Sequence, residues 1–228
     1  MASSRPAVLV FDVNETLIDI ESLAVQFGRM FGDPAVLREW FGQLVTYSMT
    51  ATLSGCYVDF FSLGRAVLHM IADIHGVEIE PDDFDALATG MRTMPAHPDV
   101  DAGLTALRAA GYRLVTLTNS PHIPGAATPL ENAGLAHHFE QQFSVDQSRL
   151  FKPATPLYLE VARQLEVQAG ACMMVAAHVW DTIGAQAAGF GGALITRLGN
   201  APLPAEGLPQ PDLIATDLVH LAAQLDTV

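Results

Sequence analysis

The feature that most constrains the fold is an uninterrupted apolar run, Ala7–Phe11, which ends at an aspartate, Asp12. Continuous apolar runs of this length are typical of strands that are buried on both faces of a parallel sheet. Similar runs recur later in the chain, at Arg113–Leu117, Met173–Ala176 and Gly192–Ile195. We therefore expect these segments to be strands of one sheet.

Helical patterns separate these runs. They span Asp101–Ala110, Pro156–Leu165 and Ile183–Ala188. Strands that alternate with helices predict an α/β domain with a doubly wound parallel sheet and right-handed crossovers. In such sheets the chemistry gathers beyond the carboxyl ends of the strands. The polar residues expected there are Asp12, Thr118, Asn119, Ser120, His178 and Asp181.

The segment 18–95 breaks this alternation. Its apolar spacing predicts consecutive helices, which are Glu21–Phe31, Ala35–Leu53, Val58–Ile74 and Asp82–Thr93. We therefore expect a helical domain at 18–95, inserted into a core made of 1–17 and 96–228. The prolines at Pro95 and Pro98 indicate the return linker, and Asn200–Pro211 is typical of a surface loop.

The charge of the chain restricts its partners. Among 228 residues, 11 Lys and Arg against 25 Asp and Glu give a net charge of −14. This balance disfavours a nucleic acid or an anionic membrane surface as a partner. No apolar run approaches the roughly 18 residues of a membrane span, and Met1–Pro6 lacks the layout of a signal peptide. We therefore expect a soluble, cytoplasmic protein.

The cysteines and paired histidines suggest no metal site. Cys56 and Cys172 lack CxxC spacing and have apolar neighbours, so we expect buried free thiols in a reducing compartment. The adjacent His137 and His138 have no nearby carboxylates at ligand spacing, so we expect them at the surface.

The loop after the first predicted strand is a good setting for a nucleophilic carboxylate. Asp12 ends a rigid buried strand, loop N–H groups can hold its charge, and Thr16 adds a hydroxyl. The alternative is that Asp12 is only an N-cap or turn residue. Other segments favour the nucleophile: Thr118–Ser120 at the end of a strand, Lys152 before a proline, and Asp181 after another strand. Lys152 is the only lysine in the chain.

These segments, in this order around a helical insertion, resemble the motifs of the haloacid dehalogenase superfamily. The resemblance extends over nearly the whole chain, and within the superfamily it is closest to the type II 2-haloacid dehalogenases. It implies a Rossmann-like core, a mobile helical cap over the active site and a homodimer.

Two positions differ from the phosphatases of that superfamily. Phosphatases carry a second aspartate two residues after the nucleophile, where this chain has Asn14, and they usually bring two acids to the last motif, where Ala177 precedes Asp181. The loss of both groups argues against phosphoryl transfer with Mg²⁺, whereas halide displacement needs no metal and no leaving-group acid. We therefore expect neither a metal nor a cofactor. A phosphatase with an altered site, or a binding protein with a degraded site, remains the alternative.

The resemblance implies hydrolysis of a short 2-haloalkanoic acid to the 2-hydroxy acid and halide. Asp12 displaces the halide and forms an ester, which water then hydrolyses. Thr16 hydrogen-bonds the carboxylates, Lys152 keeps the pKa of Asp12 low, and Asp181 holds Lys152 and positions or activates the water. The substrate-binding residues that we expect are Val13, Asn14, Phe41, Phe60, Thr118, Asn119, His178 and Trp180.

The chain departs from the family pattern at the substrate end. In type II enzymes an arginine after the cap tryptophan helps to bind the departing halide, but here Phe41 follows Trp40. The last motif of those enzymes carries Ser and Asn where this chain has Ala176 and His178. We hypothesise that His178 takes over part of that role, the alternative being a structural histidine. Arg38 either reaches inward or is a solvated helix residue.

Overall fold

The structure, a computed structural model, describes residues 5–227, in which a six-stranded parallel sheet is flanked by helices. The strand order is β3-β2-β1-β4-β5-β6, and every neighbouring pair is parallel. The strands are β1 (Val8–Phe11), β2 (Arg113–Thr118), β3 (Gln141–Ser144), β4 (Cys172–Ala176), β5 (Gly191–Ile195) and β6 (Leu213–Ala215). The doubly wound α/β sheet expected from the apolar runs is confirmed.

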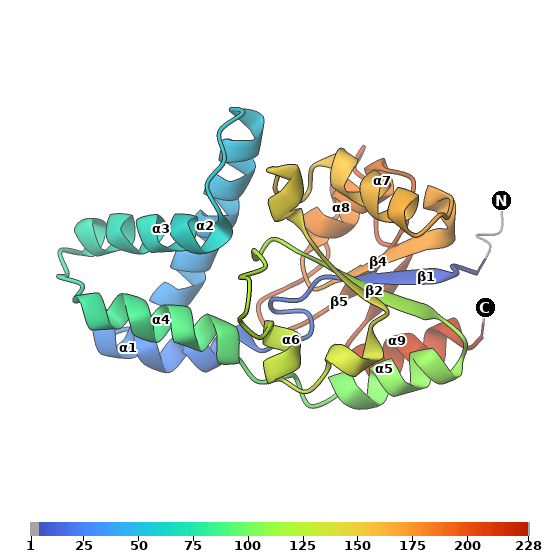
Figure 1. Cartoon of the computed structure of the whole chain (residues 1–228), viewed down its shortest axis with the longest axis horizontal. Helices are drawn as coiled ribbons and strands as arrows, with labels where there is room; N and C mark the ends of the chain where they lie inside the picture. Colours follow the sequence, from blue (N-terminus) through green and yellow to red (C-terminus); the bar gives the residue numbers. More distant parts are fainter. Residues whose placement is uncertain (1–4, 228) are drawn as a thin grey trace.

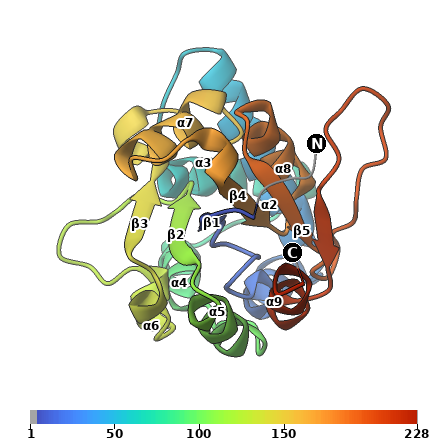
Figure 2. The same ribbon diagram turned by 90° about the vertical axis from the view of Figure 1, so that its right-hand side faces the viewer.

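Strand β1 lies in the middle of the sheet, between β2 and β4, with Phe11 opposite Thr116 and Val175. Its four residues are completely buried because helices cover both faces. Figures 1 and 2 show α7 (Thr155–Gln164) and α8 (Val179–Ala187) on one face, and α5 (Val100–Ala109) and α9 (Leu218–Leu225) on the other. The strand order reverses between β1 and β4, where ligands bind in sheets of this kind. Asp12 follows β1 at this point.

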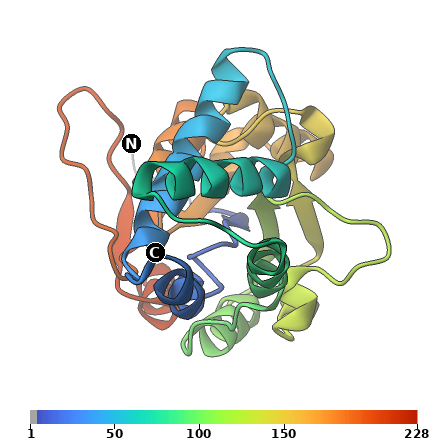
Figure 3. The same ribbon diagram turned by 90° about the vertical axis from the view of Figure 1, so that its left-hand side faces the viewer.

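A second group of helices lies beyond the carboxyl end of β1 (Figures 1 and 3). It contains η1 (Ile20–Leu23), α1 (Ala24–Phe31), α2 (Val36–Leu53), α3 (Phe60–His75) and α4 (Pro81–Thr93). Short elements elsewhere are α6 (Pro129–Asn132), η2 (Ala136–His138), η3 (Val145–Ser148) and η4 (Ala169–Ala171). Neither α2, with 18 residues, nor any other helix within 5–227 is long and apolar enough to cross a membrane.

The chain enters and leaves this group of helices, which we call the cap, at one place. The backbone N–H of Asp19 donates to the carbonyl oxygen of Pro95 (2.7 Å), and that of His97 donates to Leu17 (3.0 Å). The outgoing and returning segments therefore lie side by side. The division into a cap at 18–95 and a core at 1–17 and 96–228 stays a prediction.

Some elements differ from the sequence expectations. The edge strands β3 and β6 and helix α9 were not predicted. Strand β3 has the sequence QQFS and no continuous apolar run, and β6 has only three residues. Helix α8 begins at Val179, before the expected Ile183, because the strand end leads directly into the helix. The segment 200–211 contains no helix or strand, as expected. Cys172 is buried, but the expectation for Cys56 is wrong: it is exposed, since it follows the end of α2.

A close approach between α8 and the segment before α7 positions Lys152. A Cβ atom added at Gly184 would lie 2.4 Å from Cβ and 2.7 Å from the carbonyl oxygen of Pro153, the residue after Lys152. Only glycine allows this contact without a shift of the backbone.

Replacing Gly184 with alanine is therefore expected to lower the free energy of unfolding by about 1–3 kcal/mol, because it overpacks this contact. Gly42, on the exposed face of α2, is the matched control, because an added Cβ there would meet nothing within 4 Å beyond its chain neighbours and the backbone of its own helix. Gly42→Ala is expected to raise the stability by about 0.5–1 kcal/mol. Urea unfolding of both variants measures the difference, and equal effects would contradict this account of Gly184.

Candidate active site

Lys152 lies between two buried carboxylates at the carboxyl edge of the sheet. Its Nζ donates hydrogen bonds to Oδ1 of Asp12 (2.8 Å), to Oδ2 of Asp181 (2.6 Å) and to the carbonyl oxygen of Leu117 (2.9 Å). An ammonium group has three N–H donors, so each of them has an acceptor. The lysine side chain is 1% exposed. The structure thus brings together the predicted nucleophile, lysine and second acid.

Thr16 holds the other oxygen of Asp12. Its hydroxyl donates to Oδ2 of Asp12 (2.8 Å) and accepts from the backbone N–H of Ala177 (2.8 Å), which follows β4. The Asp12 carboxylate is therefore fixed on both sides, by Lys152 and by Thr16. It cannot rotate without breaking one of these hydrogen bonds.

Tyr158 of α7 holds the second acid. Its hydroxyl donates to Oδ1 of Asp181 (2.6 Å), and both side chains are fully buried. Sequence reasoning missed this residue, because Tyr158 lies in the apolar stripe of its helix beside Leu157 and Val161 and resembles an ordinary core aromatic. A buried tyrosine hydroxyl needs a hydrogen-bond acceptor, and this need is the signal in the sequence that could have identified Tyr158.

The loop after β2 contributes amide and hydroxyl groups. Oδ1 of Asn119 accepts from the backbone N–H of Lys152 (3.0 Å), so Asn119 helps to place the lysine. Oγ1 of Thr118 accepts from the backbone N–H of Ser120 (3.1 Å), and Nδ2 of Asn14 donates to Oγ of Ser120 (3.1 Å). The hydrogen bond between Asn14 and Ser120 ties the loops after β1 and β2 together.

His178 and Glu15 form a second charged pair beside Asp12. Nε2 of His178 lies 2.7 Å from Oε2 of Glu15, and Nδ1 lies 3.6 Å from Oδ2 of Asp12. The imidazole ring lies between Phe41 of the cap and Trp180 of α8, with ring centroids 5.5 and 5.1 Å away. Sequence reasoning did not single out Glu15. The signal that could have found it is a carboxylate between Asn14 and Thr16 in a buried loop, because a buried carboxylate needs a cation.

Arg38 reaches the core from helix α2. Its guanidinium pairs with Glu15 and with Glu21, and Nη2 donates to the carbonyl oxygen of Leu198 (2.9 Å). Its side chain is 34% exposed. The alternative of a solvated helix residue is therefore wrong, because the loops after β1 and β5 meet the cap at this arginine.

The buried charges shift one another's pKa values. Burial raises the pKa of Asp12, but Lys152 and His178 outweigh it and hold the pKa well below its usual range. Burial lowers the pKa of Lys152, but the charges of Asp12 and Asp181 outweigh it and raise the pKa. Burial and the charge of Asp12 raise the pKa of Asp181, although Lys152 and Tyr158 donate to it. Asp12 is therefore ionised and Lys152 protonated at neutral pH, and Asp181 is the more basic carboxylate.

A cavity of about 10 Å³ lies against Asp12. Its other lining residues are Asn14, Phe41, Val45, Phe60, Asn119, His178 and Trp180. Most of the expected substrate-binding residues thus lie around one cavity with Asp12. Val13 and Thr118 do not line this cavity. They line a larger one, of about 330 Å³, which also borders Phe61 of α3 and Arg92 of α4.

Comparison with known proteins identifies the family of this chain. The family model described as haloacid dehalogenase-like hydrolase matches residues 6–189. The chain belongs to this family. The hydrolase is 30% identical over 205 residues to (S)-2-haloacid dehalogenase 1 of Pseudomonas sp. (strain CBS-3), and the match covers 88% of each chain. It is 31% identical over 151 residues to the phosphoglycolate phosphatase of Cupriavidus necator, and this match covers 61% of this chain and 64% of the phosphatase.

A solved structure is similar over almost the whole hydrolase. It is the L-2-haloacid dehalogenase from Xanthobacter autotrophicus with chloropropionic acid covalently bound. The TM-score is 0.86, the identity is 25%, and the match covers 97% of this chain and 98% of that chain.

The residues around Asp12 in this hydrolase do not fit the magnesium ion that phosphatases of the superfamily use. Magnesium needs several oxygen ligands around it, but Nζ of Lys152 occupies the space between the carboxylates of Asp12 and Asp181. Asn14 directs its amide to Ser120, and Ala177 has no side-chain ligand.

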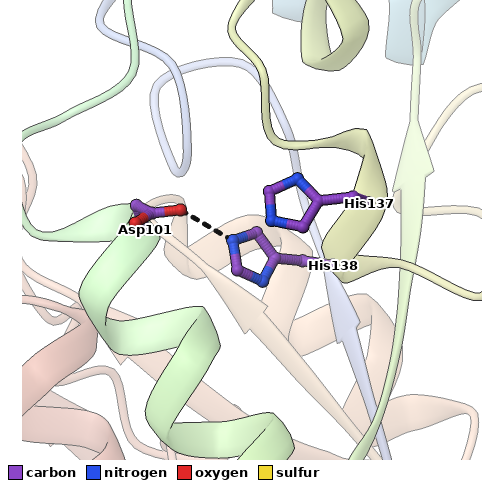
Figure 4. Close-up of side chains that lie close together, drawn as sticks. All are labelled: Asp101, His137 and His138. Atoms are coloured by element: carbon purple, nitrogen blue, oxygen red, sulfur yellow. Dashed lines mark hydrogen bonds and ion pairs between the residues drawn. The ribbon is translucent and has the colours of Figure 1, made fainter.

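Within residues 5–227, one group of three His, Cys, Asp or Glu side chains is close enough to share a metal ion, namely Asp101, His137 and His138 (Figure 4). None of them lines the cavity beside Asp12. Nε2 of His138 lies 2.8 Å from Oδ1 of Asp101, and this histidine is buried. His137 is exposed, as expected, but the expectation is wrong for His138, which is buried because α5 brings Asp101 to it from a distant part of the chain.

Replacing Lys152 with methionine is expected to lower the free energy of unfolding at pH 7 by about 3–5 kcal/mol, because it leaves two buried carboxylates without their cation. Lys152 holds the pKa of Asp12 below its ordinary value, so this stabilisation is present above pH 3.8 and is lost as the pH falls further. The difference in the free energy of unfolding between the wild-type protein and Lys152→Met should therefore become smaller as the pH falls.

Urea unfolding at pH 7 and at low pH measures this difference. Arg163→Met is the control, because Arg163 is 71% exposed and its ion pair with Glu160 contributes little. A deficit for Lys152→Met as small as that of the control would contradict the prediction.

Proposed function

We propose that this hydrolase converts a short 2-haloalkanoic acid to the 2-hydroxy acid and halide through an ester of Asp12, without a metal ion. The observation that carries the proposal is the fixed ammonium of Lys152 between Asp12 and Asp181. It keeps Asp12 ionised beside a cavity with aromatic walls. The similarity to (S)-2-haloacid dehalogenases, one of them with chloropropionic acid covalently bound, supports the same chemistry.

In the first step an oxygen of Asp12 attacks C2 of the substrate. The electron pair of the carbon–halogen bond leaves with the halide, C2 is inverted, and the new carbon–oxygen bond makes an ester. Lys152 and Thr16 hold the two carboxylate oxygens in place, which supplies the orientation that displacement requires. Asn119 and His178 offer donors for the substrate carboxylate or the halide, and the aromatic walls exclude bulk water.

In the second step water hydrolyses the ester. Its oxygen bonds to the carboxyl carbon of Asp12, the bond between that carbon and the substrate oxygen breaks, and the 2-hydroxy acid and a proton are released. Asp181 positions or activates this water, supported by its raised pKa and its contact with Lys152. Tyr158 holds Asp181 in place for this role.

The alternative of a phosphatase has less support from the site. Phosphoryl transfer needs a cation to neutralise the phosphate oxygens and an acid for the leaving group. The carboxylates that would bind the metal are engaged by Lys152, and Asn14 cannot give up a proton as an acid. A carbon–halogen bond needs neither group.

The size of the cavity supports a short substrate and a cap that moves. About 10 Å³ beside Asp12 is close to the volume of a single water molecule. Phe41 and Phe60, which close it, belong to cap helices α2 and α3. Displacement of the cap helices would admit a substrate of two or three carbons and then close over it.

We also propose that the enzyme acts in the cytoplasm as a homodimer. The free thiols of Cys56 and Cys172 support a reducing compartment. Exposed apolar side chains support a partner surface on the cap, notably Val25 (81%), Leu53 (88%) and Ile74 (66%). Sedimentation velocity measures the mass in solution, and a monomer at micromolar concentration would contradict the dimer.

The purified protein is expected to release halide from 2-chloropropionate or a haloacetate in the presence of EDTA. Asp12→Asn is expected to release none, because the amide is not a nucleophile at C2. A panel of fluoro-, chloro- and bromo-acids, with ion chromatography of the product, identifies the leaving group. Mass spectrometry of the wild-type protein mixed rapidly with substrate should detect the ester on Asp12. Phosphate release from a generic ester that disappears with EDTA would instead favour the phosphatase.

The pH profile is expected to fall on its alkaline side near the pKa of His178. Burial lowers this pKa, but the charge of the nearby Asp12 and the hydrogen bond and charge of Glu15 raise it to about 9. Lys152 titrates later, because its pKa is raised above 10.5. kcat/KM should therefore be constant from mildly acidic pH to about pH 8 and fall through pH 9. His178→Asn should move this limb to higher pH, and a limb that stays in place would rule out His178 as its origin.

A further inference from the structure

Glu15 is a buried carboxylate at a backbone position that favours glycine. Its φ is +70°, in the left-handed region where a side chain is strained, and its side chain is only 2% exposed. A glutamate at this position is therefore opposed both by backbone strain and by loss of solvation. The interactions of its carboxylate must offset both effects.

Donors converge on Glu15 from three parts of the chain. Oε2 accepts from Nε2 of His178 (2.7 Å), and Oε1 accepts from Nδ2 of Asn200 (2.8 Å) and from the guanidinium of Arg38. An ionised carboxylate is only an acceptor, so Nε2 of His178 must carry a proton. Arg38 and Asn200 fix Oε1 and thereby aim Oε2 at the imidazole.

The other ring nitrogen of His178 faces the nucleophile. Nδ1 lies 3.6 Å from Oδ2 of Asp12, beyond hydrogen-bond distance, and has no hydrogen-bond partner within residues 5–227. His178 is 8% exposed and lines the cavity beside Asp12. The charged groups that face its ring are Asp12 and Glu15, with Lys152 and Arg38 beyond them on the far side of each carboxylate. An unpartnered buried N–H at a reaction cavity is satisfied when an acceptor arrives.

We propose that Glu15 is a positioning residue that holds His178 as an imidazolium, with Nδ1–H directed at the cavity to bind the anionic group of the substrate. The proposal rests on the proposed function for the identity of that group, a haloacid carboxylate or the departing halide. In this chain the imidazolium supplies the cation that Phe41, at the cap position after Trp40, cannot supply. Glu15 acts through His178 and does not touch the substrate.

Glu15→Gln tests the charge, and Glu15→Gly tests the side chain at a position whose backbone suits glycine, so that this variant is expected to fold. In both variants, NMR titration of His178 in the resting protein is expected to give a pKa shifted from about 9 toward 6.5. Glu160→Gln is the control, because Glu160 is at the surface and bonds Arg163 and Gln164; it should leave the His178 titration and the activity unchanged.

Kinetics at two pH values separates positioning from a general structural effect. At pH 8.5, Glu15→Gln is expected to raise KM for the haloacid about tenfold, because a pKa near 7 leaves few of the His178 rings charged. At pH 6, where His178 is protonated in either protein, KM should approach the wild-type value. In the His178→Asn background, Glu15→Gln should change KM little at either pH.

A His178 pKa that remains near 9 in both Glu15 variants would overturn the proposal, as would an increase in KM that is equal at both pH values. If the wild-type protein releases no halide, the proposed function fails, but the titration still decides the link between Glu15 and His178. In that case acetate serves as the anionic probe. It should perturb the His178 resonances of the wild-type protein at pH 8.5 and those of Glu15→Gln much less, and equal perturbation would overturn the proposal.

Discussion

The buried ammonium of Lys152 is the interaction on which the site depends. Two carboxylates in a dry interior repel each other, and one of them would take up a proton. The three N–H groups of Lys152 instead join Asp12, Asp181 and the end of β2, so that Asp12 stays ionised. The packing of α8 on the segment before α7, at Gly184 and Pro153, sets the position of this charge. The packing of the core therefore also determines the pKa values of the carboxylates at the site.

Around this centre every buried acid of the site has a cation beside it. The acids Asp12, Glu15 and Asp181 face the cations Lys152, His178 and Arg38. The protein as a whole carries a charge of −14, which gives no long-range attraction to a carboxylate substrate. The attraction must come from fixed donors inside the cavity. Aromatic side chains from the cap and from α8 surround one of these donors and keep water from weakening its charge.

The sequence predicted the central strands and the cap helices because their patterns are continuous and local. β1 reads as a strand from its apolar run alone, whereas β3, at the sheet edge, has the sequence QQFS and no such run. The residues that bond Asp12 were also predictable, because they lie at strand ends or in a recognisable motif. Glu15 and Tyr158 were not singled out. Their partners stand 163 and 23 positions away, and no periodicity relates them.

By itself the sequence determined the parallel sheet, the insertion after the first strand and the set of polar groups at the carboxyl edge, because burial imposes a pattern on neighbouring residues. Only the tertiary structure decided which of those groups carry which protons. It placed Lys152 against two acids, turned His178 toward Glu15 and Asp12, and brought Arg38 from the cap to the core. The reason is physical: a pKa depends on the distances between charges and on their shielding from water, and both exist only once distant segments have packed together.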